Sequence, residues 1–116
     1  MGYYGLLNRS GLELVKSKKM LTRDEMRDLV GVKADYNYFI VGSSKSFSDT
    51  HIDLVCGDES INKGHDPTCV TREGYTLHGQ ILILGSDVTG GNFQLLTKKQ
   101  AEIVRTQVKF LACLIN

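Results

Sequence analysis

The stretch YTLHGQILILGS, residues 75–86, is the most apolar run of the chain and decides its fold. An apolar run of this length between turn residues predicts a central strand, and Gly79 within it predicts a bulge. Upstream, HIDLVCG alternates Ile52, Leu54 and Cys56 with the residues between them. This period of two predicts a half-buried strand.

Turn residues divide much of the remaining chain into further strands. YYGLLN and LELVKSKKM are separated by Arg9-Ser10-Gly11, which predicts an N-terminal hairpin. Residues 32–42 are rich in aromatic and β-branched side chains and predict another strand. Gly90-Gly91 lies between two strand-like segments and predicts a second hairpin after the central strand.

Two capping boxes indicate where two helices begin. Thr22 precedes Glu25, and Thr97 precedes Gln100, at the spacing that lets side chains and backbone amides satisfy each other. The first helix is short because Gly31 is a natural end. Beyond the second box, apolar residues recur at helical spacing, which predicts a helix to residue 116. Its apolar stripe consists of Ala101, Val104, Val108, Leu111 and Ile115.

These elements predict an α+β fold in which a twisted, mostly antiparallel sheet carries a short helix and a longer C-terminal helix. The length predicts a single domain, residues 1–116. The net charge of +1 argues against a general nucleic-acid coat protein. The three cysteines include no CxxC pair, and no run of about 18 apolar residues occurs. We therefore expect a cytoplasmic protein that does not contact membranes.

The segment CGDESINKGHDPTCV, residues 56–70, gathers cysteines, a histidine and acidic residues in one loop. Cys56, His65 and Cys69 are nine and four residues apart, unlike the closely paired ligands of structural zinc sites. We therefore predict no metal and no cofactor, and interpret the loop as turn chemistry with Cys56 in the core. The residues of this loop that remain candidates for binding are Asp58, Glu59, His65 and Asp66.

Two surfaces of the C-terminal helix are further candidates. Its cations predict a basic face that binds an anionic partner, and a solvated charged face is the alternative. A second apolar face predicts self-association into a homodimer, unless those side chains pack under the first helix or the hairpin. The basic face consists of Lys98, Lys99, Arg105 and Lys109, and the self-association face of Ile103, Phe110 and Leu114.

Several short motifs occur in a recognisable order: Leu29-Val30-Gly31, Asp58-Glu59, Gly64 with Pro67, Leu77-His78-Gly79, and Leu96-Thr97 with Gln100. In this order the chain resembles a family of small uncharacterised domains carried by bacteriophages, plasmids and other mobile elements. The chain departs from the family pattern in two places: the asparagine after the proline is missing, with Thr68 and Cys69 nearby instead, and Ser60 replaces a turn glycine.

The resemblance implies a mobile-element accessory protein in the cytoplasm of a host cell, and it supplies no reaction. We therefore expect a protein that is not an enzyme and that binds and inhibits a host defence or nucleic-acid-processing enzyme. The first alternative is a protein that sequesters a nucleotide signal or nucleic acid with the backbone amides of residues 85–92 and nearby lysines. The second is a small hydrolase that uses Cys56, His65 and Cys69.

Overall fold

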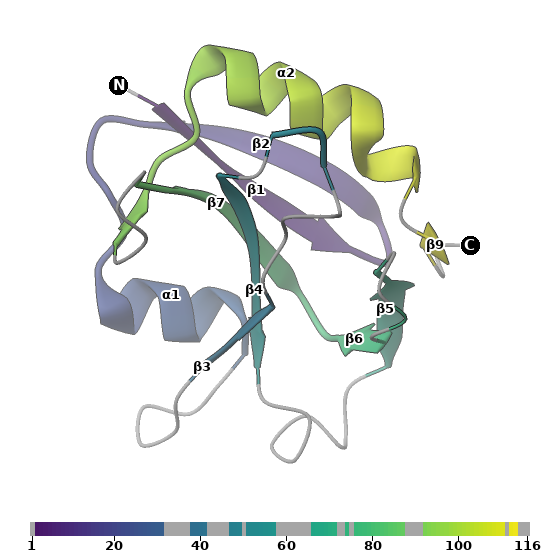
Figure 1. Ribbon diagram of the computed structural model, residues 1–116. Coiled ribbons are helices and arrows are strands. Elements are labelled where there is room, and N and C mark those ends of the chain that lie inside the picture. The colour runs from purple at the N-terminus through teal and green to yellow at the C-terminus, as the bar shows by residue number, and fades with distance from the viewer. Residues whose placement is uncertain are drawn as a thin grey trace.

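The computed structural model describes residues 2–31, 38–41, 47–49, 51–57, 66–71, 74, 76–87, 92–110 and 112–113; at residues 38–41, 110 and 112–113 it describes the backbone. A large antiparallel sheet has the strand order β2-β1-β7-β4-β3, and β8 extends it by pairing with β7 (Figure 1). A smaller antiparallel sheet has the order β6-β5-β9. The predicted α+β fold is confirmed.

The elements have the following bounds. The large sheet contains β1 (Gly2–Asn8), β2 (Gly11–Ser17), β3 (Tyr38–Val41), β4 (Ile52–Gly57), β7 (Ile81–Ser86) and β8 (Phe93–Gln94). The small sheet contains β5 (Pro67–Val70), β6 (Thr76–His78) and β9 (Ala112–Cys113). The helices are α1 (Arg23–Leu29) and α2 (Lys98–Gln107), and the 3₁₀ turn η1 (Val108–Phe110) follows α2.

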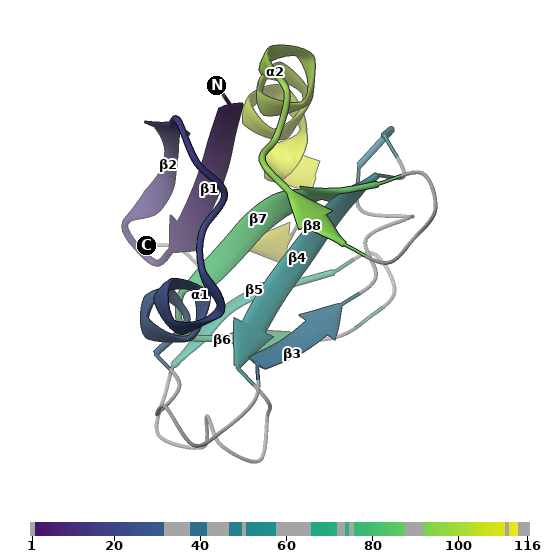
Figure 2. The same ribbon diagram turned by 90° about the vertical axis from the view of Figure 1, so that its left-hand side faces the viewer.

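The two helices cover opposite faces of the large sheet (Figures 1 and 2). Successive side chains of a strand point to opposite faces, so the central strand β7 contributes to two cores. Ile81 and Ile83 join the cluster that includes Val104 of α2, whereas Leu82 packs with Met26 of α1. Each of these side chains is at most 3% exposed, and burying one contributes about 1.5–3 kcal/mol.

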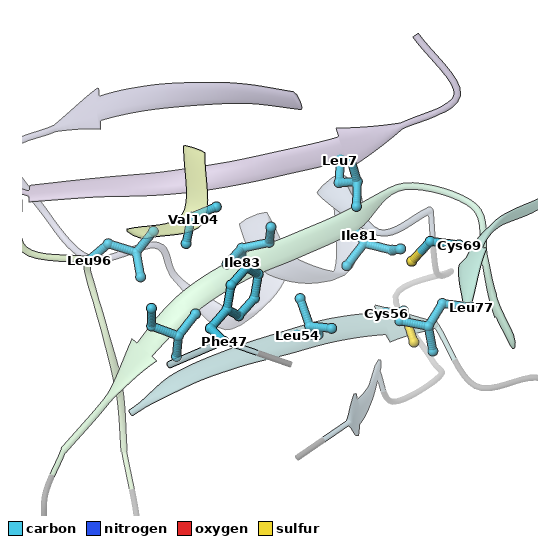
Figure 3. Close-up of a cluster of buried hydrophobic side chains, with 11 residues drawn as sticks. Leu7, Phe47, Leu54, Cys56, Cys69, Leu77, Ile81, Ile83, Leu96 and Val104 are labelled. Carbon is cyan, nitrogen blue, oxygen red and sulfur yellow. The ribbon is translucent and has the colours of Figure 1, made fainter. Parts of the chain in front are cut away.

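The small sheet covers the same face as α2. Cys69 of β5 and Leu77 of β6 lie at one end of the larger cluster, near Leu7 and Ile81, while Val104 lies at the other end (Figure 3). Cys56 of β4 is 2% exposed in this cluster, which confirms its prediction as a small core residue. The larger core therefore joins both sheets and α2.

Local signals in the sequence place the hairpins and the helix starts. β1 pairs with β2 from Gly2–Ser17 to Asn8–Gly11, as the turn signal predicts. Both capping boxes form, with the hydroxyls of Thr22 and Thr97 accepting hydrogen bonds from backbone amides three residues later. Gly31 follows α1 with a φ of 74°, a conformation that favours glycine. β7 and β8 form the second predicted hairpin.

The run at residues 75–86 is not one strand. Its first part forms β6 in the small sheet and its second part forms β7 in the large sheet. Gly79, with a φ of 72°, makes the corner between them and not a bulge within a strand. The run stays apolar through the corner because β6 contributes to the larger core and β7 is buried on both faces, so hydrophobicity alone does not reveal the corner.

Strand β4 is buried on both faces, which corrects the prediction of a half-buried strand. Ile52 and Leu54 face the larger core, as the alternation predicts. Val55 is also fully buried, because its face of the sheet is covered in the cluster that includes Met26 of α1. The neighbours β7 and β3 place β4 inside the sheet, a position that alternation does not encode.

The prediction of one helix to residue 116 is wrong. The α-helix ends at Gln107, and after η1 the chain forms strand β9 against β5. From residue 108 onwards the only charged residue is Lys109, so a continued helix would be apolar on nearly every side. A short apolar run fits a strand equally well, and pairing with β5 satisfies backbone groups that a sheet edge exposes.

The prediction that a second face of this helix mediates self-association is therefore also wrong, because the three residues do not lie on one helix. Ile103 is partly buried against the larger core, and Phe110 lies in η1, beyond the helix. Leu114 lies outside the residues that the structure describes. Self-association itself stays a prediction.

Candidate binding surface

An open depression of about 440 Å³ lies where the β1–β2 turn, the C-terminal end of α1 and the β6–β7 corner meet. We call this surface the polar depression, because most of the side chains around it are polar. It is open and not enclosed, and therefore fits a protruding group of a partner better than an engulfed small molecule. It is lined by Asn8, Arg9, Asp28, Leu29, Val30, Gly31, Asp66, Thr68, Gly79 and Gln80.

The side-chain amide of Gln80 forms hydrogen bonds to two other segments that line the polar depression. Its Nε2 donates to the backbone carbonyl of Leu29 at 2.7 Å, and its Oε1 accepts from Nδ2 of Asn8 at 3.0 Å. The carbonyl of Leu29 belongs to the last turn of α1, where no intrahelical donor remains. Asn8 in turn accepts from the backbone amide of Ser10 within the β1–β2 turn at 2.8 Å. One side chain therefore joins α1, the β6–β7 corner and the first hairpin.

The corner at Gly79 is held from both sides by the start of β5. The amide of Gly79 donates to the carbonyl of Asp66 at 3.1 Å, and the buried hydroxyl of Thr68 donates to the carbonyl of Gly79. These bonds fix the backbone of Asp66 and the start of β5 against the β6–β7 corner. Because the hydroxyl of Thr68 satisfies the carbonyl of Gly79, this side chain has a structural role.

The rim of the polar depression carries charges of both signs. A guanidinium nitrogen of Arg9 lies 3.6 Å from a carboxylate oxygen of Asp66, and the two side chains are 43% and 80% exposed. Asp28 at the end of α1 adds a second exposed carboxylate. An exposed pair of this kind contributes about 0–1 kcal/mol to stability, so both charged groups stay available to a partner.

The structure brings one of the four predicted loop candidates to this surface. Asp66 lies on the rim, whereas Asp58, Glu59 and His65 lie outside the described residues. Arg9, Asn8 and Gln80 were missed, since each belongs to a turn or corner whose neighbours come from distant parts of the chain. The sequence predicts a turn at Arg9-Ser10-Gly11, but nothing in it shows what lies opposite that turn.

The cysteines of the predicted hydrolase site are core residues. Cys56 and Cys69 are 2% and 0% exposed, and both belong to the larger apolar cluster. A nucleophilic thiol must reach its substrate, and thiols this deeply buried do not reach one while the surrounding structure stays closed. Among the residues that the structure describes, no group of three histidine, cysteine or acidic side chains could hold a metal ion.

The predicted basic face is mixed in charge. Lys98, Lys99 and Arg105 are exposed on α2, as is Lys109 in η1. However, Glu102 lies one turn from both Lys98 and Arg105 on the helix surface, and its carboxylate pairs with the guanidinium of Arg105. The concentration of positive charge along α2 is therefore lower than the four cations alone indicate.

Two further findings concern membrane-spanning helices and similarity to known proteins. In the part of the chain that the structure describes, no helix is long and apolar enough to span a membrane. No protein-family model matches the chain, and no curated protein or solved structure is significantly similar to it.

Proposed function

We propose that this protein acts by binding another protein through the polar depression. The observation that carries the proposal is the exposed pair of Arg9 and Asp66 on a floor fixed by hydrogen bonds. Charges of both signs around a less polar centre are typical of the rim of a protein–protein interface. A fixed floor favours binding, because fewer side chains lose conformational freedom when the partner arrives.

The two lining residues of the polar depression with apolar side chains, Leu29 and Val30, belong to the end of α1. Leu29 is partly buried in the smaller core, and Val30 is fully buried beneath the surface. A partner side chain that enters here would meet backbone and apolar atoms first and the charged groups around them. This arrangement suits a long side chain with a polar tip, whose stem is apolar.

The charges of the polar depression do not favour a nucleotide there. Asp28 and Asp66 both carry carboxylates, and their repulsion of a phosphate outweighs the single guanidinium of Arg9. The alternative function as a nucleotide-binding protein relies on residues 85–92, of which 88–91 lie outside the described part of the chain. We therefore place protein binding first and keep nucleotide binding as the outcome that would contradict it.

The nature of the partner follows from the family resemblance and not from the geometry. A mobile-element accessory protein acts on its host, so we propose a host defence enzyme or a nucleic-acid-processing enzyme as the target, bound in the host cytoplasm. Inhibition by binding requires surface complementarity and no catalytic group.

Native mass spectrometry of the tagged protein, recovered intact from bacterial cells, tests this proposal. We expect a complex with a second protein in a fixed ratio. The double variant Arg9→Asp/Asp66→Arg keeps an ion pair but exchanges its charges, so it should fold normally and lose the complex. The matched control Lys98→Glu/Lys99→Glu changes a distant exposed surface and should retain it. Recovery of a bound nucleotide in place of a protein would contradict the proposal.

A further inference from the structure

The two cysteines Cys69 and Cys113 are paired residues in the small sheet. Cys69 lies in β5 and Cys113 in β9, and the register of this antiparallel pair sets their Cα atoms directly opposite each other. We propose that these two residues form a redox-sensitive disulfide that fastens β9 to β5. The inference does not depend on the proposed binding function.

The backbone geometry satisfies the distance that a disulfide requires. Residues directly opposite in an antiparallel pair have Cα atoms about 4.5 or 5.5 Å apart, depending on whether they exchange hydrogen bonds. Both distances fall within the range of about 4.4–6.8 Å observed for disulfides. Cys56, the remaining cysteine, lies in β4 of the other sheet, and β4 has no register with either β5 or β9.

Access to Cys69 requires the small sheet to open at its edge. Cys69 is completely buried, so an oxidant cannot reach it while β9 is in place. Among the described residues, β9 pairs with β5 through two residue pairs, and short edge elements open at a small fraction of the global free energy of unfolding. We therefore expect oxidation in the native protein without global unfolding.

The chemistry is a thiol–disulfide exchange with a small disulfide such as oxidised glutathione. One protein thiolate attacks a glutathione sulfur, which breaks the glutathione disulfide, forms a mixed disulfide and releases one glutathione thiolate. The second protein thiolate then attacks the protein sulfur of the mixed disulfide and releases the second glutathione. The two cysteines lose two electrons and two protons in total, and two molecules of reduced glutathione gain them.

The disulfide would join Cys69 to Cys113 and so close a long loop in the second half of the chain. It would hold the C-terminal strand on β5, the strand that also carries Thr68 beneath the polar depression. A cross-link that closes a long loop restricts the unfolded chain and raises stability. In the reduced protein this cross-link is absent, so the redox state would control how firmly β9 is held on β5.

A non-reducing tryptic peptide map distinguishes every pairing, since each cysteine falls in a different peptide. Cys56 lies in residues 46–63, Cys69 in 64–72 and Cys113 in 110–116. After incubation of the folded full chain with oxidised glutathione, we expect a cross-link between peptides 64–72 and 110–116. The intact mass should fall by about 2 Da, and dithiothreitol should reverse the change. The melting temperature of the oxidised protein should be higher than that of the reduced protein.

Single variants supply the controls. Cys113→Ser should abolish the cross-link, while Cys56→Ala should leave it intact, because Cys56 takes no part in the exchange. The wild-type map is decisive even where a variant fails to fold. A cross-link that includes peptide 46–63, glutathione adducts without a cross-link, or three unchanged thiols after prolonged incubation would each overturn the proposal.

Discussion

Replacing Gln80 by alanine should destabilise the protein although no large apolar side chain is removed. The substitution deletes the hydrogen bonds to the Leu29 carbonyl at 2.7 Å and from Asn8 Nδ2 at 3.0 Å, both partly buried. Each contributes about 0.5–1.5 kcal/mol net, so we expect a loss of about 1–3 kcal/mol. Urea unfolding followed by circular dichroism measures this loss as a lower midpoint at unchanged m-value.

A matched variant separates this network from a general effect of removing glutamine. Gln94 donates to the carbonyl of Ser86 at 3.2 Å on the exposed surface, and Gln94→Ala should change stability by less than about 0.5 kcal/mol. In a double-mutant cycle, Gln80→Ala and Asn8→Ala should be coupled by about 0.5–1.5 kcal/mol. Equal losses in the two glutamine variants, or a coupling energy of zero, would refute the reasoning.

Three further changes test other parts of the structure. Gly2→Ala should lower the urea midpoint, because the new Cβ would lie 2.8 Å from the backbone oxygen of Leu96; an unchanged midpoint would show that β1 does not pack as described. The pKa of Glu25 is lowered, chiefly by the hydrogen bond from the backbone amide of Thr22 at the helix cap. Ionised Glu25 therefore stabilises the fold at pH values above the ordinary carboxyl pKa. This contribution is lost as the pH falls through the lowered pKa. The excess stability of wild type over Glu25→Gln should therefore shrink on acidification in thermal melts, and a difference independent of pH would contradict this. Lys98→Glu/Lys99→Glu should change stability by less than about 1 kcal/mol in urea unfolding, because the gain from acidic residues in the first turn of α2, which has none, is offset by repulsion from Glu102 one turn away; a larger change would argue against this electrostatic account.

Local chemistry is what the sequence predicts best in this protein. The capping boxes at Thr22 and Thr97 form as predicted, and α1 ends before Gly31 as predicted. Each of these features depends on residues within one helical turn. The first hairpin is equally local, with its register set by a turn of two residues. These signals were sufficient to predict the α+β class.

Errors arise where a distant part of the chain decides the conformation. Gly79 was interpreted as a bulge because one apolar run continues through it, although the two halves of the run join different sheets. The segment after Gln107 was interpreted as helix because its apolar residues fit a helical period, while pairing with β5 makes it a strand. β5 itself was missed, since Thr68 and Cys69 follow a polar loop and their burial depends on the larger core.

The polar depression was beyond prediction for the same reason. Arg9 and Asp66 are 57 residues apart in the chain (66 − 9), and Gln80 reaches Leu29 across 51 residues. Single-sequence patterns report spacings of a few residues, so only the three-dimensional structure shows that these side chains share a surface. The sequence predicted Asp66 as a binding candidate, but it did not identify the residues that surround Asp66 in the structure.

The affinity of the recovered partner for the charge-exchanged variant tests the central claim most directly. Titration calorimetry would compare wild type, Arg9→Asp/Asp66→Arg and Lys98→Glu/Lys99→Glu against the same purified partner. Exchanged charges set like charges against each other across the interface, which costs several kcal/mol and corresponds to at least about a hundredfold weaker binding. We predict that loss for the first variant and unchanged affinity for the second. Unchanged affinity for the first variant, with loss for the second, would move the interface to α2 and contradict the account.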